Sequence, residues 1–197
     1  MSELKSGEVV SLTNGSNARI LKELGRGGQG IVYLVDVGSI QMALKWYINP
    51  AAVGVVLYDD NNNVLFEVRA KEPRKGFLCL PGGFVDGGES TENAIVRECR
   101  EELGAQLTKD EVTYLCSFPN IYEYKNIEYK TCDIFFAAKL PACYKDMNDF
   151  VKSLKREESE VVRFEIHRVK NPEDVESLAL AFPSARATLL KWISKDI

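Results

Sequence analysis

Three glutamates near the middle of the 197-residue chain, Glu98, Glu101 and Glu102, have a spacing that could do chemistry. On an α-helix, positions i, i+3 and i+4 place all three carboxylates on one face. Like charges on one face repel each other unless something cationic binds there. Hard divalent cations prefer oxygen ligands, and magnesium is usually held by a few carboxylates together with waters and phosphates. By itself the run Arg100–Leu103 would be interpreted as a solvated charged face, and the neighbouring glycine turn and the upstream Glu98 favour a divalent-cation site instead.

A glycine-rich turn and a capped helix would position these glutamates. Pro81-Gly82-Gly83 bends the chain after a short apolar segment, and Ser90 is a preferred N-cap residue for the helix that follows. Gly104 supplies the left-handed residue that commonly ends a helix. The sequence therefore predicts a helix between Ser90 and Gly104, directly after a tight turn.

The whole pattern resembles the Nudix box, G-x5-E-x7-R-E-U-x-E-E-x-G-U, in which U is a bulky aliphatic residue. The chain matches it as Gly83-x5-Glu89-x7-Arg97-Glu98-Cys99-x-Glu101-Glu102-x-Gly104-Ala105. Every polar and glycine position agrees, whereas Cys99 and Ala105 are smaller than the aliphatic residues they replace. The resemblance continues on both sides of the box, over about residues 50–195. It implies a Nudix-type α/β/α sandwich with a mixed sheet.

The resemblance also implies a set of site residues and a reaction. Glu98, Glu101 and Glu102 would bind Mg²⁺ or Mn²⁺, with Glu98 as general base and the Gly82 carbonyl as a backbone ligand. Four residues of the box would have structural roles: Gly83, Glu89, Arg97 and Gly104. Arg97 would hold Glu89 or the loop. The reaction would be hydrolysis of a phosphoanhydride in a nucleoside diphosphate linked to another group, such as NADH, ADP-ribose, a nucleotide sugar or a nucleoside triphosphate.

Residues outside the box are candidates for further contacts. Arg69 and Arg74 could hold phosphates, or they are isolated surface cations. Tyr122 and Tyr124 could stack on a base, or they are packing residues. A later glutamate often completes such sites in the family, and one charged run supplies three candidates: Glu157, Glu158 and Glu160. That run is equally consistent with a solvated segment.

The pattern of the larger part of the chain predicts an α+β domain. Ala52–Tyr58 and Val64–Arg69 are β-rich runs on either side of an Asp/Asn turn and indicate a hairpin. Other expected elements are strands at Thr113–Phe118, Glu128–Lys139 and Val161–His167, a turn at Lys125-Asn126, a short helix or loop at Met147–Lys155, and helices starting at Pro172 and Pro183. Together they predict a mixed sheet between helical layers.

The start of the chain has a different pattern. Ala18–Leu24, Ile31–Val37 and Gln41–Ile48 predict a three-stranded antiparallel meander. Leu24–Tyr33, followed by Ala43-Leu44-Lys45, resembles the glycine-rich loop and strand lysine of a protein kinase. The chain has no H-R-D catalytic loop and no D-F-G metal site, so kinase activity is not expected.

These patterns predict two domains. Residues 1–48 would be an N-terminal β-meander, which is a packing element, a nucleotide binder or the remnant of a fusion. Residues 49–197 would be the Nudix domain.

Composition restricts the partners and the location. The formal net charge is -4 at pH 7, whereas polymeric nucleic acid normally requires a basic face. Five cysteines without a CxxC pair argue against a disulfide framework or a zinc ribbon and favour a reducing cytoplasm. We expect no signal peptide and no membrane-spanning segment. The expected partner is a small nucleotide substrate, and the protein could also form a homodimer.

Two functions from different classes are consistent with these residues. The complete set of box glutamates favours a metal-dependent pyrophosphohydrolase. The alternative is a non-catalytic nucleotide-binding or regulatory module with the same fold. The two differ because the module would bind nucleotides without turning them over.

Overall fold

The computed structural model describes residues 3–27, 30–47, 51–124 and 127–194, except for the side chains of residues 47, 122–124 and 127–129. The chain divides into two compact units. The first comprises Met1–Pro50 together with Phe84–Gly88, and the second comprises Ala51–Gly83 together with Glu89–Ile197. Each unit contains its own β-sheet and its own hydrophobic core.

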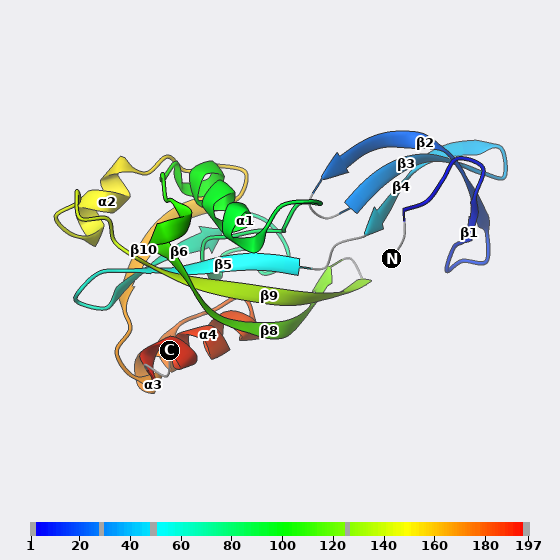
Figure 1. Cartoon of the computed structure of the whole chain (residues 1–197). Helices are drawn as coiled ribbons and strands as arrows, with labels where there is room; N and C mark the ends of the chain where they lie inside the picture. Colours follow the sequence, from blue (N-terminus) through cyan, green and yellow to red (C-terminus); the bar gives the residue numbers. More distant parts are fainter. Residues whose placement is uncertain (1–2, 28–29, 48–50, 125–126, 195–197) are drawn as a thin grey trace. The chain divides into compact units, whose positions relative to one another are not determined.

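The larger unit is built on a mixed six-stranded sheet (Figure 1). Five strands follow the order β10-β6-β5-β9-β8, and β7 pairs with β6. β5 and β9 are parallel, and the other neighbouring pairs are antiparallel. The strands are Ala51–Tyr58 (β5), Asn63–Arg69 (β6), Leu78–Cys79 (β7), Val112–Tyr124 (β8), Ile127–Lys139 (β9) and Val161–Arg168 (β10).

Helices cover both faces of this sheet, with α1 (Thr91–Glu98) over one face and α4 (Pro183–Ile193) over the other (Figure 1). The remaining helical segments are short: the π-helical turn η1 (Cys99–Leu103), the 3-10 turn η2 (Lys109–Glu111), α2 (Met147–Ser153) and α3 (Pro172–Ser177). This arrangement confirms the α+β sandwich with a mixed sheet. Within the described ranges, no helix has the length and apolar character needed to cross a bilayer.

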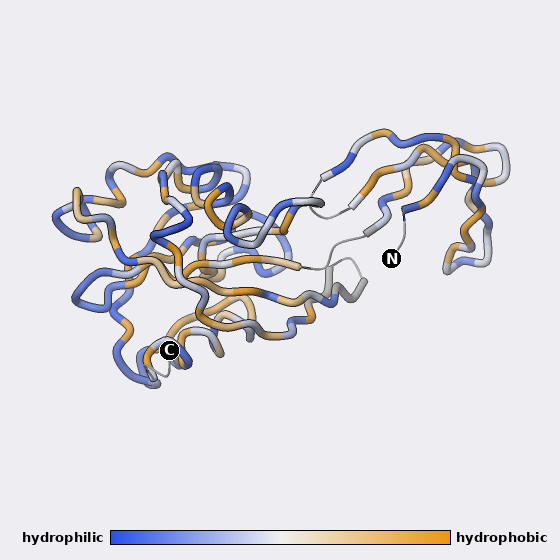
Figure 2. Tube along the Cα trace, viewed as in Figure 1, coloured by the Kyte–Doolittle hydropathy of each residue, from blue (hydrophilic) through white to orange (hydrophobic). Residues whose placement is uncertain are grey.

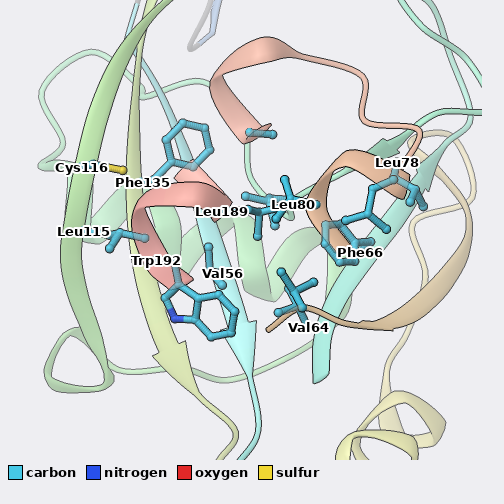
Figure 3. Close-up of a cluster of buried hydrophobic side chains, with 14 of the residues drawn as sticks. Val56, Val64, Phe66, Leu78, Leu80, Leu115, Cys116, Phe135, Leu189 and Trp192 are labelled. Atoms are coloured by element: carbon cyan, nitrogen blue, oxygen red, sulfur yellow. The ribbon is translucent and has the colours of Figure 1, made fainter. Parts of the chain in front are cut away.

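The main hydrophobic core lies between the sheet and α4 (Figure 3). Phe66 of β6 is fully buried in it, and Leu189 and Trp192 of α4 are also part of it. Figure 2 shows the matching run of hydrophobic residues along β5. Because successive strand residues point to opposite faces, Leu65 and Glu67 of β6 face away from this core, toward the side covered by α1.

The smaller unit contains a four-stranded antiparallel sheet in the order β1-β2-β3-β4. Its strands are Val9–Ser11 (β1), Asn17–Gly27 (β2), Gly30–Val37 (β3) and Ile40–Tyr47 (β4). The buried core of this sheet consists of Ala18, Ile20, Ile31, Tyr33 and Val35. The predicted meander is present as β2, β3 and β4. The structure adds β1, whose three residues are too few to show a β period in the sequence.

Most predicted elements of the larger unit are confirmed. β5 and β6 form the hairpin around the Asp/Asn turn, and Pro172 and Pro183 each begin a helix. The segment Met147–Lys155, left open as helix or loop, contains α2. The strand predicted at Thr113–Phe118 is longer than expected and forms β8. The turn predicted at Lys125-Asn126 lies outside the described residues.

Candidate functional site

The box helix begins at the predicted cap and changes geometry after Glu98. The Ser90 side chain accepts a hydrogen bond from the Asn93 amide, and α1 runs from there to Glu98. The next five residues form the π turn η1, and Gly104 follows it in the left-handed conformation, with a φ of 67°. A π turn has more residues per turn than an α turn, so the angles between the side chains of Glu98, Glu101 and Glu102 differ from those in a regular α-helix.

The three glutamates differ in how far they are exposed. The Glu98 side chain is 12% exposed, whereas that of Glu101 is 52% exposed. Glu102 is partly buried, and its Oε2 atom accepts a hydrogen bond from the Gly82 amide at 3.0 Å. Glu98 and Glu102 thus lie against the glycine turn, and Glu101 is the most exposed of the three, although its Oε2 atom and Oε1 of Glu98 both contact Nη1 of Arg97.

The glycine turn fits closely against β5 and the box helix. A Cβ atom on Gly82, which has a φ of 147°, would lie 2.1 Å from the Val53 carbonyl oxygen. A Cβ atom on Gly83 would lie 2.5 Å from Oε1 of Glu98. The Val53 amide also donates a hydrogen bond to the Gly83 carbonyl at 2.8 Å. Gly82 thus lets the turn approach the strand backbone, and Gly83 leaves room for the Glu98 carboxylate.

Arg97 connects the carboxylates of the box. Its Nη2 atom lies 2.7 Å from Oε1 of Glu89, which agrees with the tie predicted from the sequence. Its Nη1 atom lies 2.8 Å from Oε1 of Glu98 and 3.2 Å from Oε2 of Glu101, and these contacts were not predicted. One guanidinium therefore offsets part of the repulsion among three glutamates.

Glu67 is a carboxylate of the site that the sequence interpretation missed. It lies on β6 and is 2% exposed. Its Oε1 atom is buried and has no hydrogen-bond partner among the described residues, and its carboxyl group lies beside that of Glu102. The only signal in the sequence is a charged residue inside the apolar run Asn63–Arg69, and glutamate is almost never fully buried unless it is paired.

Burial and like charges raise the pKa values of these two carboxyl groups. Burial is the main cause that raises the pKa of Glu102 to about 8; the Gly82 amide opposes the shift, and the charges of Glu98 and Glu160 add to it. Burial also raises the pKa of Glu67 well above 4.5, and the neighbouring Glu102 raises it further. The site therefore holds an electrostatic repulsion that a cation or a proton would relieve.

Glu160 differs from the other two late glutamates. Its charge acts on Glu102, and its carboxylate also pairs with Lys71. The Glu158 side chain is 83% exposed, and Glu157 is exposed and accepts hydrogen bonds within its own turn. The Glu157 amide donates a hydrogen bond to the Glu102 carbonyl at 3.3 Å, but among the three carboxylates of this run it is that of Glu160 whose charge acts on Glu102.

The residues predicted to contact substrate have different surroundings. Arg69 is partly buried, packs over the Phe182 ring at 5.1 Å, and its charge acts on the carboxyl groups of Glu67 and Glu102. Arg74 is exposed, as an ordinary surface cation would be. The side chains of Tyr122 and Tyr124 lie outside the described residues. Arg69 is therefore the cation that the structure brings to the acidic site.

The donor set at the glycine turn fits a hard divalent cation in its chemistry. Carboxylates of Glu98 and Glu102 lie against the turn, and next to Glu102 lies Glu67, whose Oε1 atom is a buried acceptor without a donor among the described residues. Across the described part of the chain, no three Asp, Glu, His or Cys side chains stand close enough to hold one ion. The Glu98 carboxylate forms an ion pair with Arg97 in this structure.

A mixed sheet between two helical layers, with carboxylates gathered at a glycine turn, defines a small α/β/α domain with an acidic site. A model of the NUDIX domain matches residues 48–192, which is most of the chain. The protein therefore belongs to the Nudix family.

Two curated proteins are similar to part of this sequence. The ADP-ribose pyrophosphatase of Methanocaldococcus jannaschii is 43% identical over 60 residues, which cover 30% of this chain and 36% of that protein. The NAD-capped RNA hydrolase of Schizosaccharomyces pombe is 37% identical over 71 residues, which cover 36% of this chain and 18% of that protein. The chain thus matches only a minor part of the length of either relative.

A solved structure shows the same fold. The MutT/nudix family protein from Enterococcus faecalis superposes with a TM-score of 0.58 and 19% sequence identity, over 77% of this chain and 63% of that one. The similarity extends over most of the larger unit's length and concerns the fold alone.

Alanine substitutions at the two glycines should separate the requirements of the fold from those of the site. Gly82→Ala places a Cβ against the Val53 carbonyl at a positive φ, so we expect it to lower the unfolding free energy by about 2 kcal/mol or more. Gly83→Ala meets only the movable Glu98 carboxylate, so we expect a melting temperature within about 2 °C of the wild type. Thermal unfolding followed by circular dichroism checks both, and equal destabilisation would contradict this account.

The raised pKa values predict how the metal-free protein responds to pH. A carboxyl group whose pKa rises on folding contributes stability that is fully present below its unfolded value of 4.5 and is lost as the pH rises through its folded value, about 8 for Glu102. In EDTA, we expect the melting temperature to fall between about pH 5 and pH 8, and to fall less in Glu102→Gln. Glu176→Gln, which removes an exposed carboxylate of α3 that pairs with Arg186, is the control for the loss of a surface charge. The same slope in wild type and Glu102→Gln would rule out this effect.

Proposed function

We propose that this protein is a Mg²⁺- or Mn²⁺-dependent hydrolase that cleaves the phosphoanhydride of a nucleoside diphosphate derivative. The observation that carries the proposal is the convergence of Glu98 and Glu102 on the Gly82-Gly83 turn within a complete box pattern. Membership of the Nudix family supports it, because divalent metal use is general among Nudix hydrolases.

ADP-ribose is the substrate we propose to test first. The two curated relatives are named for ADP-ribose and for NAD-capped RNA, and both substrates contain an adenosine diphosphate joined to a second ribose. The matched segments are short, so NADH, nucleotide sugars and nucleoside triphosphates belong in the same panel. All of them are small polyphosphates, which an acidic protein binds when a cation neutralises both partners.

We assign the roles within the site as follows. Glu98, Glu101 and Glu102 would hold the cation, with the Gly82 carbonyl as a backbone ligand. The cation would neutralise phosphate oxygens and lower the pKa of a bound water. Glu98 would accept the proton of the attacking water, because it is the carboxylate that lies against the turn at Gly83.

Arg97 would hold the loop through Glu89 while Glu98 binds the cation and accepts the proton. Its contact with Glu89 uses Nη2 and Nε, and its contact with Glu98 uses Nη1, so the two carboxylates bind different atoms of the guanidinium. Glu98 can therefore leave Arg97 for the cation without loss of the Arg97–Glu89 pair. This assignment gives Glu89 a structural role and Glu98 a catalytic one.

The double substitution Glu98→Gln with Glu102→Gln tests the proposed reaction. The amides keep the shape of the side chains and remove their charge, so we expect AMP release from ADP-ribose in Mg²⁺ to fall by at least about 100-fold. Glu176→Gln should stay near the wild type. Chromatography of the products from the whole panel measures both.

Two results would contradict this function. Hydrolysis that survives the double substitution would refute the metal assignment. Tight binding of a panel nucleotide by the wild type, with no turnover in Mg²⁺ or Mn²⁺, would favour the non-catalytic module.

We propose that residues 1–48 and 49–197 are two domains and that the first is not needed for nucleotide binding. The N-terminal sheet has its own buried core, and its kinase-like features stop at Lys45, on β4. Five free cysteines also support a reducing compartment such as the cytoplasm.

Lys45→Ala tests the role of the kinase-like segment. If the N-terminal sheet does not bind nucleotide, we expect the Kd for ADP-ribose, measured by calorimetry, to change by less than about twofold, the usual range for surface substitutions. Lys22→Ala, at an exposed position of β2, is the matched control. A large loss of affinity in Lys45→Ala alone would instead support nucleotide binding by this sheet.

A further inference from the structure

Glu67 and Glu102 form a buried pair of carboxylates from distant parts of the sequence. Glu67 comes from β6 and Glu102 from η1, and their carboxyl groups lie side by side. Glu102 accepts the Gly82 amide through Oε2. For Glu67, the Cys79 thiol lies 3.9 Å from Oε2, and Oε1 has no partner among the described residues.

This pairing is costly because both groups only accept hydrogen bonds when they are ionised. A buried carboxylate without a partner loses its hydration and gains nothing in return. Arg69 acts on both groups, but its Nε atom donates to the Pro73 carbonyl and its guanidinium packs over Phe182. Arg69 therefore offsets only part of the charge of the pair, which lies on the side of the sheet that the box helix covers.

We propose that Glu67 is a direct ligand of the divalent cation, which it binds together with Glu102. The inference rests on the proposed function, since it adds a residue to the site at which that function takes place. It explains why a strand whose neighbouring positions, Phe66 and Val68, lie in the hydrophobic core carries a fully buried glutamate. Glu67 would also give the cation a ligand from the sheet, so that the ion would be bound by both the sheet and the box helix.

The contrasting role for Glu67 is a purely structural one, as a neutral acid that hydrogen-bonds to Glu102. Glutamine has nearly the same shape as glutamate, so Glu67→Gln fits the site in either case and changes only the charge and hydrogen-bonding capacity of the side chain. An amide cannot replace a carboxylate as a charged ligand, but it can still donate a hydrogen bond to Glu102. Metal affinity, measured without substrate, is therefore the property that distinguishes the two.

The experiment measures Mn²⁺ binding to the full chain by the loss of the free-ion EPR signal. We expect Glu67→Gln and Glu102→Gln each to raise the Kd for Mn²⁺ by at least about tenfold, the size of effect seen when residues that support metal sites are changed. Glu176→Gln should leave the Kd unchanged. In EDTA, the melting temperature of Glu67→Gln should equal or exceed that of the wild type, because the substitution removes a repulsion and keeps the side-chain volume.

The outcomes distinguish this inference from the proposed function. A wild-type Kd in Glu67→Gln, with a weakened one in Glu102→Gln, would overturn the role of Glu67 and leave the proposed metal dependence standing. A wild-type protein that binds no Mn²⁺ would overturn both. If Glu67→Gln does not fold, Glu67→Asp tests the same role, because aspartate keeps the negative charge but its side chain is shorter by one methylene group. Weaker Mn²⁺ binding by Glu67→Asp would support the ligand role of Glu67, and unchanged binding would refute it.

Discussion

The fit of the Gly82-Gly83 turn against the box helix is the interaction on which the site depends. The Gly82 amide holds the Glu102 carboxylate at 3.0 Å, and the missing side chain of Gly83 leaves the space that Glu98 fills. The same turn is hydrogen-bonded to β5 through Val53. Strand, turn and helix therefore meet at two residues without side chains, and the positions of the two carboxylates depend on this close packing of the backbone.

Repulsion among the glutamate carboxylates opposes this arrangement. Arg97 offsets it on the exposed side, where one guanidinium contacts Glu89, Glu98 and Glu101. On the buried side, Glu67 and Glu102 face each other, and burial raises both of their pKa values. The fold thus keeps a repulsion at the place where a divalent cation and a diphosphate would meet. Binding of the cation would relieve that repulsion, which links metal binding to the stability of the domain.

Local features of the site could be predicted from the sequence, and features that depend on packing could not. The Ser90 cap, the left-handed Gly104 and the Arg97–Glu89 pair follow from residues close together in the chain. The π turn η1 was not predicted, because the helical spacing of apolar residues in the sequence does not distinguish one π turn from the last turn of an α-helix, and Glu101 is more exposed than Glu98. Glu67 was missed because its burial beside Glu102 exists only once β6 and η1 have packed together.

The most direct test of the account is a crystal structure of the protein with Mn²⁺, using anomalous scattering to locate the ion. We expect an anomalous peak at the glycine turn, within about 2.0–2.6 Å of carboxylate oxygens of Glu98 and Glu102, in the range for hard divalent cations. We also expect that Glu98 has turned away from Arg97 while the Arg97–Glu89 pair is kept. A peak elsewhere in the molecule, or none at the turn at saturating Mn²⁺, would contradict this account.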